Sequence, residues 1–169
     1  MIGGRYANLA PPNQLRGSSL KDSLSKRCGD LVTLNSTHRD CMPGFLGISV
    51  TAVGRDFIRA KMPVDQRTTQ PFGILHGGAS VALAETLGSI ASWLLVSGQP
   101  GARVAGVEVS ASHLKAVSSG YVTAVCRPLR IGRTLHFWQI NVYNGEGARC
   151  CAARLTVSVS GAQDLDLSC

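Results

Sequence analysis

Aromatic side chains are scarce in this sequence, at 5% of its 169 residues, and acidic ones are outnumbered, with 10 Asp and Glu against 17 Lys and Arg. The resulting net charge of +7 is scattered, without a dense basic run or an aromatic-rich RNA-binding motif. Nucleic-acid-binding surfaces combine both features, so we expect no nucleic-acid partner. The basic excess suits a phosphorylated small molecule, and solubility alone explains it equally well.

A long apolar run is also lacking. The best candidate for a membrane span, residues 87–96, is short and has Glu85 nearby, whereas a spanning helix needs about 20 apolar residues. The N-terminus has no apolar centre typical of a secretory signal peptide. We therefore expect a cytoplasmic protein that does not enter a membrane.

The six cysteines include no pair with the C-x-x-C spacing of zinc and redox sites. Cys150 and Cys151 are adjacent, so in a strand their side chains point to opposite faces. We expect reduced, mostly structural cysteines. The histidines are too far apart in sequence to suggest a ligand cluster, so neither a metal nor a cofactor is expected.

Apolar residues make up 44% of the chain, and its length favours a single domain. Residues 1–29 contain Gly-Gly, Pro-Pro, several Ser and few acids, which predicts a flexible N-terminal extension. Residues 30–160 form the domain, and residues 161–169 form a polar tail.

Hydrophobic periodicity predicts one long helix among strands. Residues 78–95 form that helix, which is apolar all round and therefore typical of the middle of a fold. A short helix is possible near residues 31–39, and strands are predicted over 47–53, 57–64, 104–117, 121–129, 134–143 and 148–159. This order predicts an α+β fold in which a mostly antiparallel sheet wraps the helix. The sheet's outer face and edges remain available for another subunit.

Glu85 is the single charged residue between Arg67 and Arg103. An isolated carboxylate among apolar residues costs several kcal/mol to bury unless it is paired or protonated. We expect a functional cleft with a perturbed pKa rather than a helix face turned to water. Ser89, four residues on, shares the same helical face and could hold water or substrate, although such a serine is also common in structural helices.

His76, Gly77 and Gly78 mark the point where a loop becomes the long helix. First-turn N–H groups have no internal partner, and glycines let a ligand approach them. Together with the helix dipole, they would stabilise an oxyanion, although a glycine pair can also be only a turn. Gln70, six residues earlier, could donate a hydrogen bond into the same pocket.

Gly77 and Glu85 are eight positions apart, which is about 12 Å along a helix. One carbonyl group cannot contact both residues within one chain. If both act on one substrate, Glu85 must come from a second subunit, and the site must lie at a two-fold interface.

The segment from Gln70 to Ser89 resembles the hotdog-fold acyl-CoA thioesterases of the phenylacetate-pathway branch. Within that branch, the sequence is most similar to the 1,4-dihydroxy-2-naphthoyl-CoA thioesterases and the enterobactin-pathway proofreading thioesterases. The likeness extends over about residues 34–159. It includes the Met62–Asp65 run, the Ser112–His113 pair and the Arg127–Leu129 run.

The resemblance implies a hotdog fold, homodimers that pair into tetramers, and specific residue roles. Glu85 matches the catalytic carboxylate, acting as nucleophile or general base, and faces the Gly77 backbone N–H, the oxyanion donor, of the neighbour. The remaining matches are polar groups around the thioester or acyl group: Gln70, His76, Ser89 and His113, with Gly78 as a further substrate-binding position.

Arg130 and Arg133 flank a predicted turn at Gly132, near Arg127. Arginines at this spacing near a strand end suit the phosphates of coenzyme A. A solvated basic strand edge explains any one of them equally well.

We expect a homo-oligomeric thioesterase that cleaves acyl-CoA, with an aromatic acyl group implied by the family likeness. Gly88 and Ser89 could leave room for that group, or Gly88 could serve only close helix–sheet packing. The alternatives are a hotdog dehydratase or hydratase, whose motifs match His-Gly-Gly poorly, and a non-catalytic acyl-CoA-binding protein. Glu85, Gln70 and Ser89 argue against the second alternative.

Overall fold

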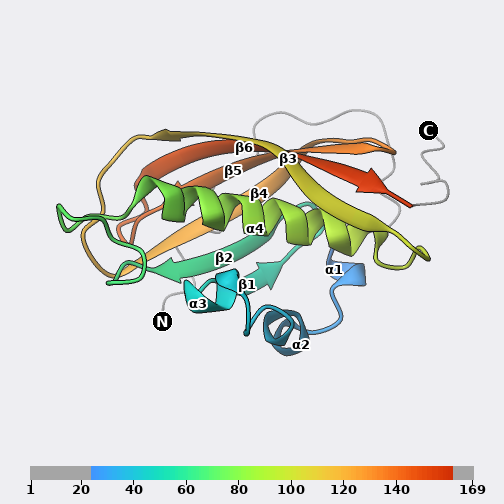
Figure 1. Ribbon diagram of the computed structural model, residues 1–169, viewed down its shortest axis with the longest axis horizontal. Coiled ribbons are helices and arrows are strands. Elements are labelled where there is room, and N and C mark those ends of the chain that lie inside the picture. Colours follow the sequence, from blue (N-terminus) through green and yellow to red (C-terminus); the bar gives the residue numbers. More distant parts are fainter. Residues whose placement is uncertain (1–23, 162–169) are drawn as a thin grey trace.

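The computed structural model describes residues 24–161, in which a six-stranded antiparallel sheet curves around one long helix (Figure 1). The strand order is β1-β2-β4-β5-β6-β3, so β1 and β3 are the two edges. The predicted α+β class and central helix are confirmed. The strands are β1 (Ser49–Val53), β2 (Ile58–Pro63), β3 (Arg103–His113), β4 (Tyr121–Ile131), β5 (Leu135–Tyr143) and β6 (Arg149–Ser160).

Three short helices precede the sheet: α1 (Leu24–Arg27), α2 (Leu31–Ser36) and α3 (Met42–Phe45). The Asp30 side chain begins α2 by accepting a hydrogen bond from the Thr33 N–H at 2.8 Å. Leu24 is only 2% exposed. The packed part of the chain therefore begins no later than Leu24, earlier than the predicted boundary at residue 30.

The long helix is α4 (Gly77–Val96). Its buried face packs into the concave side of the sheet, and the Trp138 indole N–H on β5 donates to the Ser92 hydroxyl at 2.8 Å within the core. Gly88 lies on this face, and a Cβ there would overlap Cδ2 of Leu155 on β6. Gly88 therefore serves close helix–sheet packing, and the expectation that it leaves room for an acyl group is wrong.

The opposite face of α4 is open, because the sheet wraps only one side of the helix. Glu85 and Trp93 are exposed in the single chain, so the prediction of a buried Glu85 is wrong. With 20 residues and a mean hydropathy of 1.5, α4 is long and apolar enough by composition to cross a membrane, in contrast to the short run expected from the sequence. However, 67% of the 18-residue stretch of α4 with this hydropathy is buried inside the structure, as in the core helix of a folded domain.

Strand β3 ends at His113 and not at the predicted residue 117, because the N–H groups of Leu114 and Lys115 turn to the Cys150 carbonyl. The five cysteines in the described range are free, as predicted: Cys28, Cys41, Cys126, Cys150 and Cys151. Cys169, residues 1–23 of the predicted extension and residues 162–169 of the predicted tail lie outside the described residues.

Candidate active site

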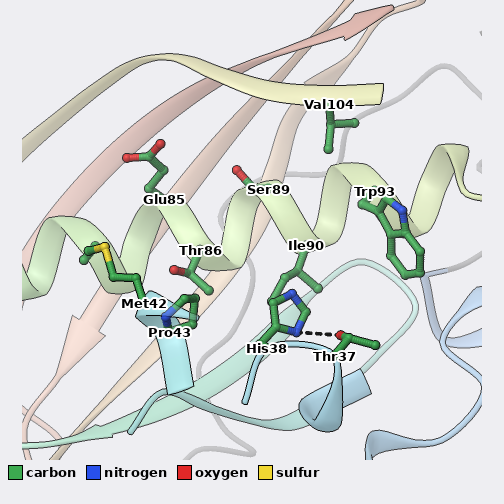
Figure 2. A pocket seen from close by; sticks show the side chains of 11 residues that line it. Thr37, His38, Met42, Pro43, Glu85, Thr86, Ser89, Ile90, Trp93 and Val104 are labelled. Atoms are coloured by element: carbon green, nitrogen blue, oxygen red, sulfur yellow. Dashed lines mark hydrogen bonds between the residues drawn. The ribbon is translucent and has the colours of Figure 1, made fainter. Parts of the chain in front are cut away.

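The open face of α4 and the α2–α3 segment enclose a cavity of about 560 Å³, which we call the helix cavity (Figure 2). It combines an apolar body with a few polar side chains. Its lining residues are Thr37, His38, Met42, Pro43, Ala82, Glu85, Thr86, Ser89, Ile90, Trp93 and Val104.

Glu85 and Ser89 lie on the same face of α4, and both side chains point toward β3 (Figure 2). A Cβ at Gly106 on β3 would come within 2.8 Å of the Glu85 carboxylate, so the glycine leaves room for this side chain. Among the described residues, neither the Glu85 carboxylate nor the Ser89 hydroxyl has a hydrogen-bond or ion-pair partner. The carboxylate is therefore free to act on a bound molecule.

A second cavity, of about 580 Å³, lies at the N-terminal end of α4, and we call it the loop cavity. It brings together four of the predicted site residues: Gln70, His76, Gly77 and His113. The remaining lining residues are Pro71, Phe72, Ile74, Leu75, Ser80, Leu114, Lys115, Ala116 and Cys150.

His76 caps α4 rather than pointing freely into the loop cavity. Its Nδ1 accepts the Gly78 N–H at 2.8 Å, so that N–H is already used in this structure. The Gly77 N–H, by contrast, has no acceptor among residues 24–161. An unpaired N–H in the first turn of a helix is a ready donor for a developing oxyanion.

Gly77 lies close to His113, because a Cβ at Gly77 would come within 2.8 Å of the His113 ring Nε2. Gln70 is held in place by the Phe72 N–H, which donates to its side-chain oxygen at 2.8 Å. That contact leaves the two N–H groups of the Gln70 amide for another acceptor. The loop cavity thus has oriented donors and no carboxylate among its lining residues.

The two cavities have no lining residue in common. Glu85 and Ser89 belong to the helix cavity, whereas Gln70, His76, Gly77 and His113 belong to the loop cavity. Within one chain, the structure therefore places the predicted residues in two separate groups. This separation agrees with the spacing of eight residues along α4.

Comparison with known proteins identifies the family. Residues 72–151 match the thioesterase superfamily. The proofreading thioesterase EntH of Cronobacter turicensis is 51% identical over 136 residues, which cover 80% of this chain and 98% of that protein. The chain belongs to the thioesterase superfamily. It is a thioester hydrolase, and the non-catalytic alternative is wrong.

Solved structures of thioesterases agree with this assignment and confirm the hotdog fold. A thioesterase from Haemophilus influenzae has a TM-score of 0.75 and 45% identity, covering 81% of this chain and 94% of its own. A variant thioesterase from Pseudomonas aeruginosa also has a TM-score of 0.75, with 47% identity and coverage of 78% and 94%.

In this thioesterase, the predicted phosphate-binding arginines lie apart from the loop cavity. Arg130 lies near the end of β4, and Gly132 and Arg133 lie in the β4–β5 turn, where the Gly132 N–H donates to the Leu135 carbonyl at 2.9 Å. The strand register places this turn near Arg103, at the start of β3. His113, which lines the loop cavity, is at the opposite end of the same strand. Arg127 pairs instead with Asp56 at 2.8 Å.

Sequence reasoning missed several residues of the helix cavity. Trp93 lies four residues after Ser89 on the same helical face, so α-helical spacing would have indicated it. Thr37, His38 and Met42 come from a segment distant in sequence, and no local pattern connects them with Glu85. Among the described residues, no group of three or more His, Cys, Asp or Glu is placed to hold a metal ion.

Proposed function

We propose that this thioesterase hydrolyses acyl-CoA at composite sites, each formed by the helix cavity of one subunit and the loop cavity of another. The separation of Glu85 and Gly77 into two cavities carries the proposal. A free carboxylate in one half-site and a free oxyanion donor in the other are chemically complementary.

The exposed edge strand β3 supports a two-fold assembly. Its side chains are mostly exposed in the single chain, and Val107 is 57% exposed. An edge strand offers unpaired backbone groups for pairing with another copy. Antiparallel pairing through β3 would bring two α4 helices into opposite directions, so that Glu85 of one approaches the helix N-terminus of the other. The proposal includes pairing of dimers into tetramers in the cytoplasm, where thiols stay reduced.

In the proposed reaction, the Gly77 N–H polarises the thioester carbonyl, aided by the oriented Gln70 amide. The Glu85 carboxylate attacks the carbonyl carbon, and the oxyanion formed is stabilised at Gly77. Its collapse breaks the C–S bond, releases the thiolate of coenzyme A and leaves an acyl–Glu85 anhydride. Water hydrolyses the anhydride to the free acid and restores the Glu85 carboxylate, and the proton released is taken up by the thiolate of coenzyme A.

The same groups also support a general-base route. Glu85 would take a proton from water as the water attacks the carbonyl carbon, and protonated Glu85 would then give its proton to the leaving thiolate. Ser89 lies beside the carboxylate in either route and is positioned to hold the water.

We propose an aromatic acyl group as the occupant of the helix cavity. Trp93 and Ile90 add a flat ring and an apolar side chain to the lining of the cavity that holds Glu85, with Trp93 about two turns further along α4 (Figure 2). Aromatic side chains bury large area and favour stacked or edge-on partners. We expect kcat/KM for benzoyl-CoA to exceed that for decanoyl-CoA by about tenfold or more. A clear preference for decanoyl-CoA would reject the aromatic group and leave the thioesterase activity standing.

Complementation between inactive variants tests the shared site. Glu85→Ala damages only the helix cavity, and Gln70→Ala damages only the loop cavity. After subunit exchange, half of the dimers are mixed and each has one intact site, so about a quarter of wild-type activity should return. A mixture of Glu85→Ala with Glu85→Gln is the matched control and should stay inactive. No recovery after confirmed exchange would contradict the composite site.

A further inference from the structure

The two edges of the sheet differ in how their backbone groups are used. Among the described residues, the backbone-to-backbone hydrogen bonds of the 11-residue edge strand β3 run to β6 alone. The opposite edge is β1, which has 5 residues. An edge strand with free N–H and C=O groups is a template for pairing with another chain. Whether β1 can pair as β3 can depends on the outward backbone groups of β1.

The outward groups of β1 are used by the chain itself. The helix α2, which contains Asn35, lies next to β1 (Figure 1). The Val50 N–H donates to Asn35 Oδ1 at 2.8 Å, and Asn35 Nδ2 donates to the Val50 carbonyl at 3.0 Å. Just before β1, the Ile48 N–H donates to the Pro43 carbonyl of α3 at 2.9 Å.

The side-chain amide of Asn35 takes the place of a neighbouring strand. A primary amide carries a donor and an acceptor, as does a residue of an antiparallel strand that exchanges both hydrogen bonds with its partner. Asn35 is half-buried, and the adjacent Leu34 is only 5% exposed, so α2 is anchored where it lies. Another strand would have to displace α2 to reach Val50.

The side chains of β1 give this edge no other protection. Its sequence, SVTAV, has no charged residue and no proline, which are the usual means of preventing strand pairing at an edge. Three of its five residues are β-branched and favour strand formation. In contrast, β3 carries Arg103 and Glu108. An uncovered β1 would therefore pair readily with another strand.

We propose that Asn35 closes β1 to strand pairing, so that copies of this chain join edge to edge through β3 alone. The inference rests on the β3 pairing included in the proposed function. Two β3 strands related by a two-fold axis use each other up, because such an interface is isologous. The combined sheet then ends in a covered β1 on both sides, and further pairing of dimers must use other surfaces.

Without this cover, the assembly would have no natural end. Strand β1 of one dimer would pair with β1 of the next, and each added dimer would expose another β1. Loss of the Asn35 amide should therefore turn a closed oligomer into one that grows with protein concentration.

Light scattering after size-exclusion chromatography tests the assembly over a wide range of protein concentration. The wild-type mass should reach a plateau. Asn35→Leu removes both hydrogen bonds at similar side-chain volume, and its mass should rise to about twice the wild-type plateau or more. Ser36→Leu is the matched control, because it adds the same apolar side chain at an exposed position of α2 and should keep the wild-type plateau.

Hydrogen exchange tests the cover on β1 directly and carries the test if Asn35→Leu does not fold. In the wild type, the Val50 N–H should be equally protected at low and high protein concentration, because its acceptor lies in the same chain. Outward N–H groups of β3 should gain protection only as copies associate. In Asn35→Leu at low concentration, the Val50 N–H should exchange about tenfold faster, because its hydrogen bond is lost.

Three outcomes would overturn this inference alone. They are a folded Asn35→Leu that keeps the wild-type mass, a Ser36→Leu that associates as far as Asn35→Leu, and a wild-type Val50 N–H whose protection rises with protein concentration. A wild type that stays monomeric at every concentration would instead overturn the two-fold assembly of the proposed function together with this inference.

Discussion

At the scale of single residues, His136 on β5 stands apart from the rest of the core. Its side chain is 0% exposed, and neither ring nitrogen has a hydrogen-bond partner among the described residues. Its ring meets Trp138 edge-on at 6.3 Å. Burial lowers the pKa of His136 from 6.5 to about 4, although the nearby Gly132 backbone acts in the opposite direction.

The pKa of His136 predicts how stability depends on pH. Between pH 6.5 and about 4, the unfolded chain binds a proton on this histidine that the folded chain does not bind. The free energy of unfolding should therefore decrease as the pH is lowered from 6.5 to about 4. At 1.36 kcal/mol per pKa unit, the decrease is about 3 kcal/mol. Urea unfolding at pH 7.5, 6, 5 and 4.5 measures the loss.

His136→Leu is the control for this prediction, because it should flatten the pH dependence within the same window. Asp30 and Asp65 interfere little, because hydrogen bonds with Thr33 and Arg67 lower their pKa values from 3.8 and the stability they contribute is lost mainly below that pH, under the range measured. An unchanged slope in His136→Leu would assign the pH dependence to other groups.

At the scale of elements, α4 has two faces with different tasks. The closed face depends on Gly88 for contact with β6, and the open face presents Glu85, Ser89 and Trp93 to the helix cavity. The helix is nearly uniform in hydropathy, so its sequence does not show which side the sheet covers. Side-chain size decides it, because only a glycine fits against Leu155.

Gly88→Ala tests this division of α4. Alanine favours a helix by about 1 kcal/mol over glycine, but its methyl group would overlap the buried Leu155, and overpacking typically costs about 1–3 kcal/mol. We expect net destabilisation, measured by thermal or urea unfolding. In a Leu155→Ala background the same change should be neutral or stabilising, because the space is then free. Equal effects in both backgrounds would show that Leu155 does not set the distance between helix and sheet.

At the scale of the whole molecule, one chain holds both halves of the proposed site but keeps them apart. Arg130 near the end of β4 and Arg133 in the β4–β5 turn lie at the Arg103 end of β3, and the loop cavity lies at the His113 end. If these arginines bind the phosphates of coenzyme A, they do so at a site that a neighbouring subunit completes. The oligomer, rather than the single chain, is then the unit that recognises the nucleotide.

Replacing both Arg130 and Arg133 with alanine tests the contribution of this turn. KM for a coenzyme A ester should rise about tenfold with kcat little changed, because phosphate contacts are equal in ground and transition states. A short thioester without the nucleotide should show no change. The double variant Lys26→Ala with Arg55→Ala removes the same charge from exposed positions and is the control. Equal effects on both substrates would exclude a role in nucleotide binding.

The sequence by itself determined the elements and the class of fold, and it predicted the candidate site residues in two groups. Periodicity located the strands and α4, and the His76–Gly78 motif located the start of the helix, because these signals are local in the chain. The spacing from Gly77 to Glu85 follows from helix geometry alone, so the separation of the half-sites could also be predicted.

Tertiary structure alone decided which face of α4 is covered and what completes the helix cavity. Glu85 is exposed because the sheet wraps only one side of the helix, and burial depends on packing between distant segments rather than on neighbours in sequence. His38 reaches the cavity from the α2–α3 segment, and its Nδ1 lies 2.9 Å from the Leu34 carbonyl oxygen. Such contacts join residues that no periodicity connects, so only the folded chain reveals them.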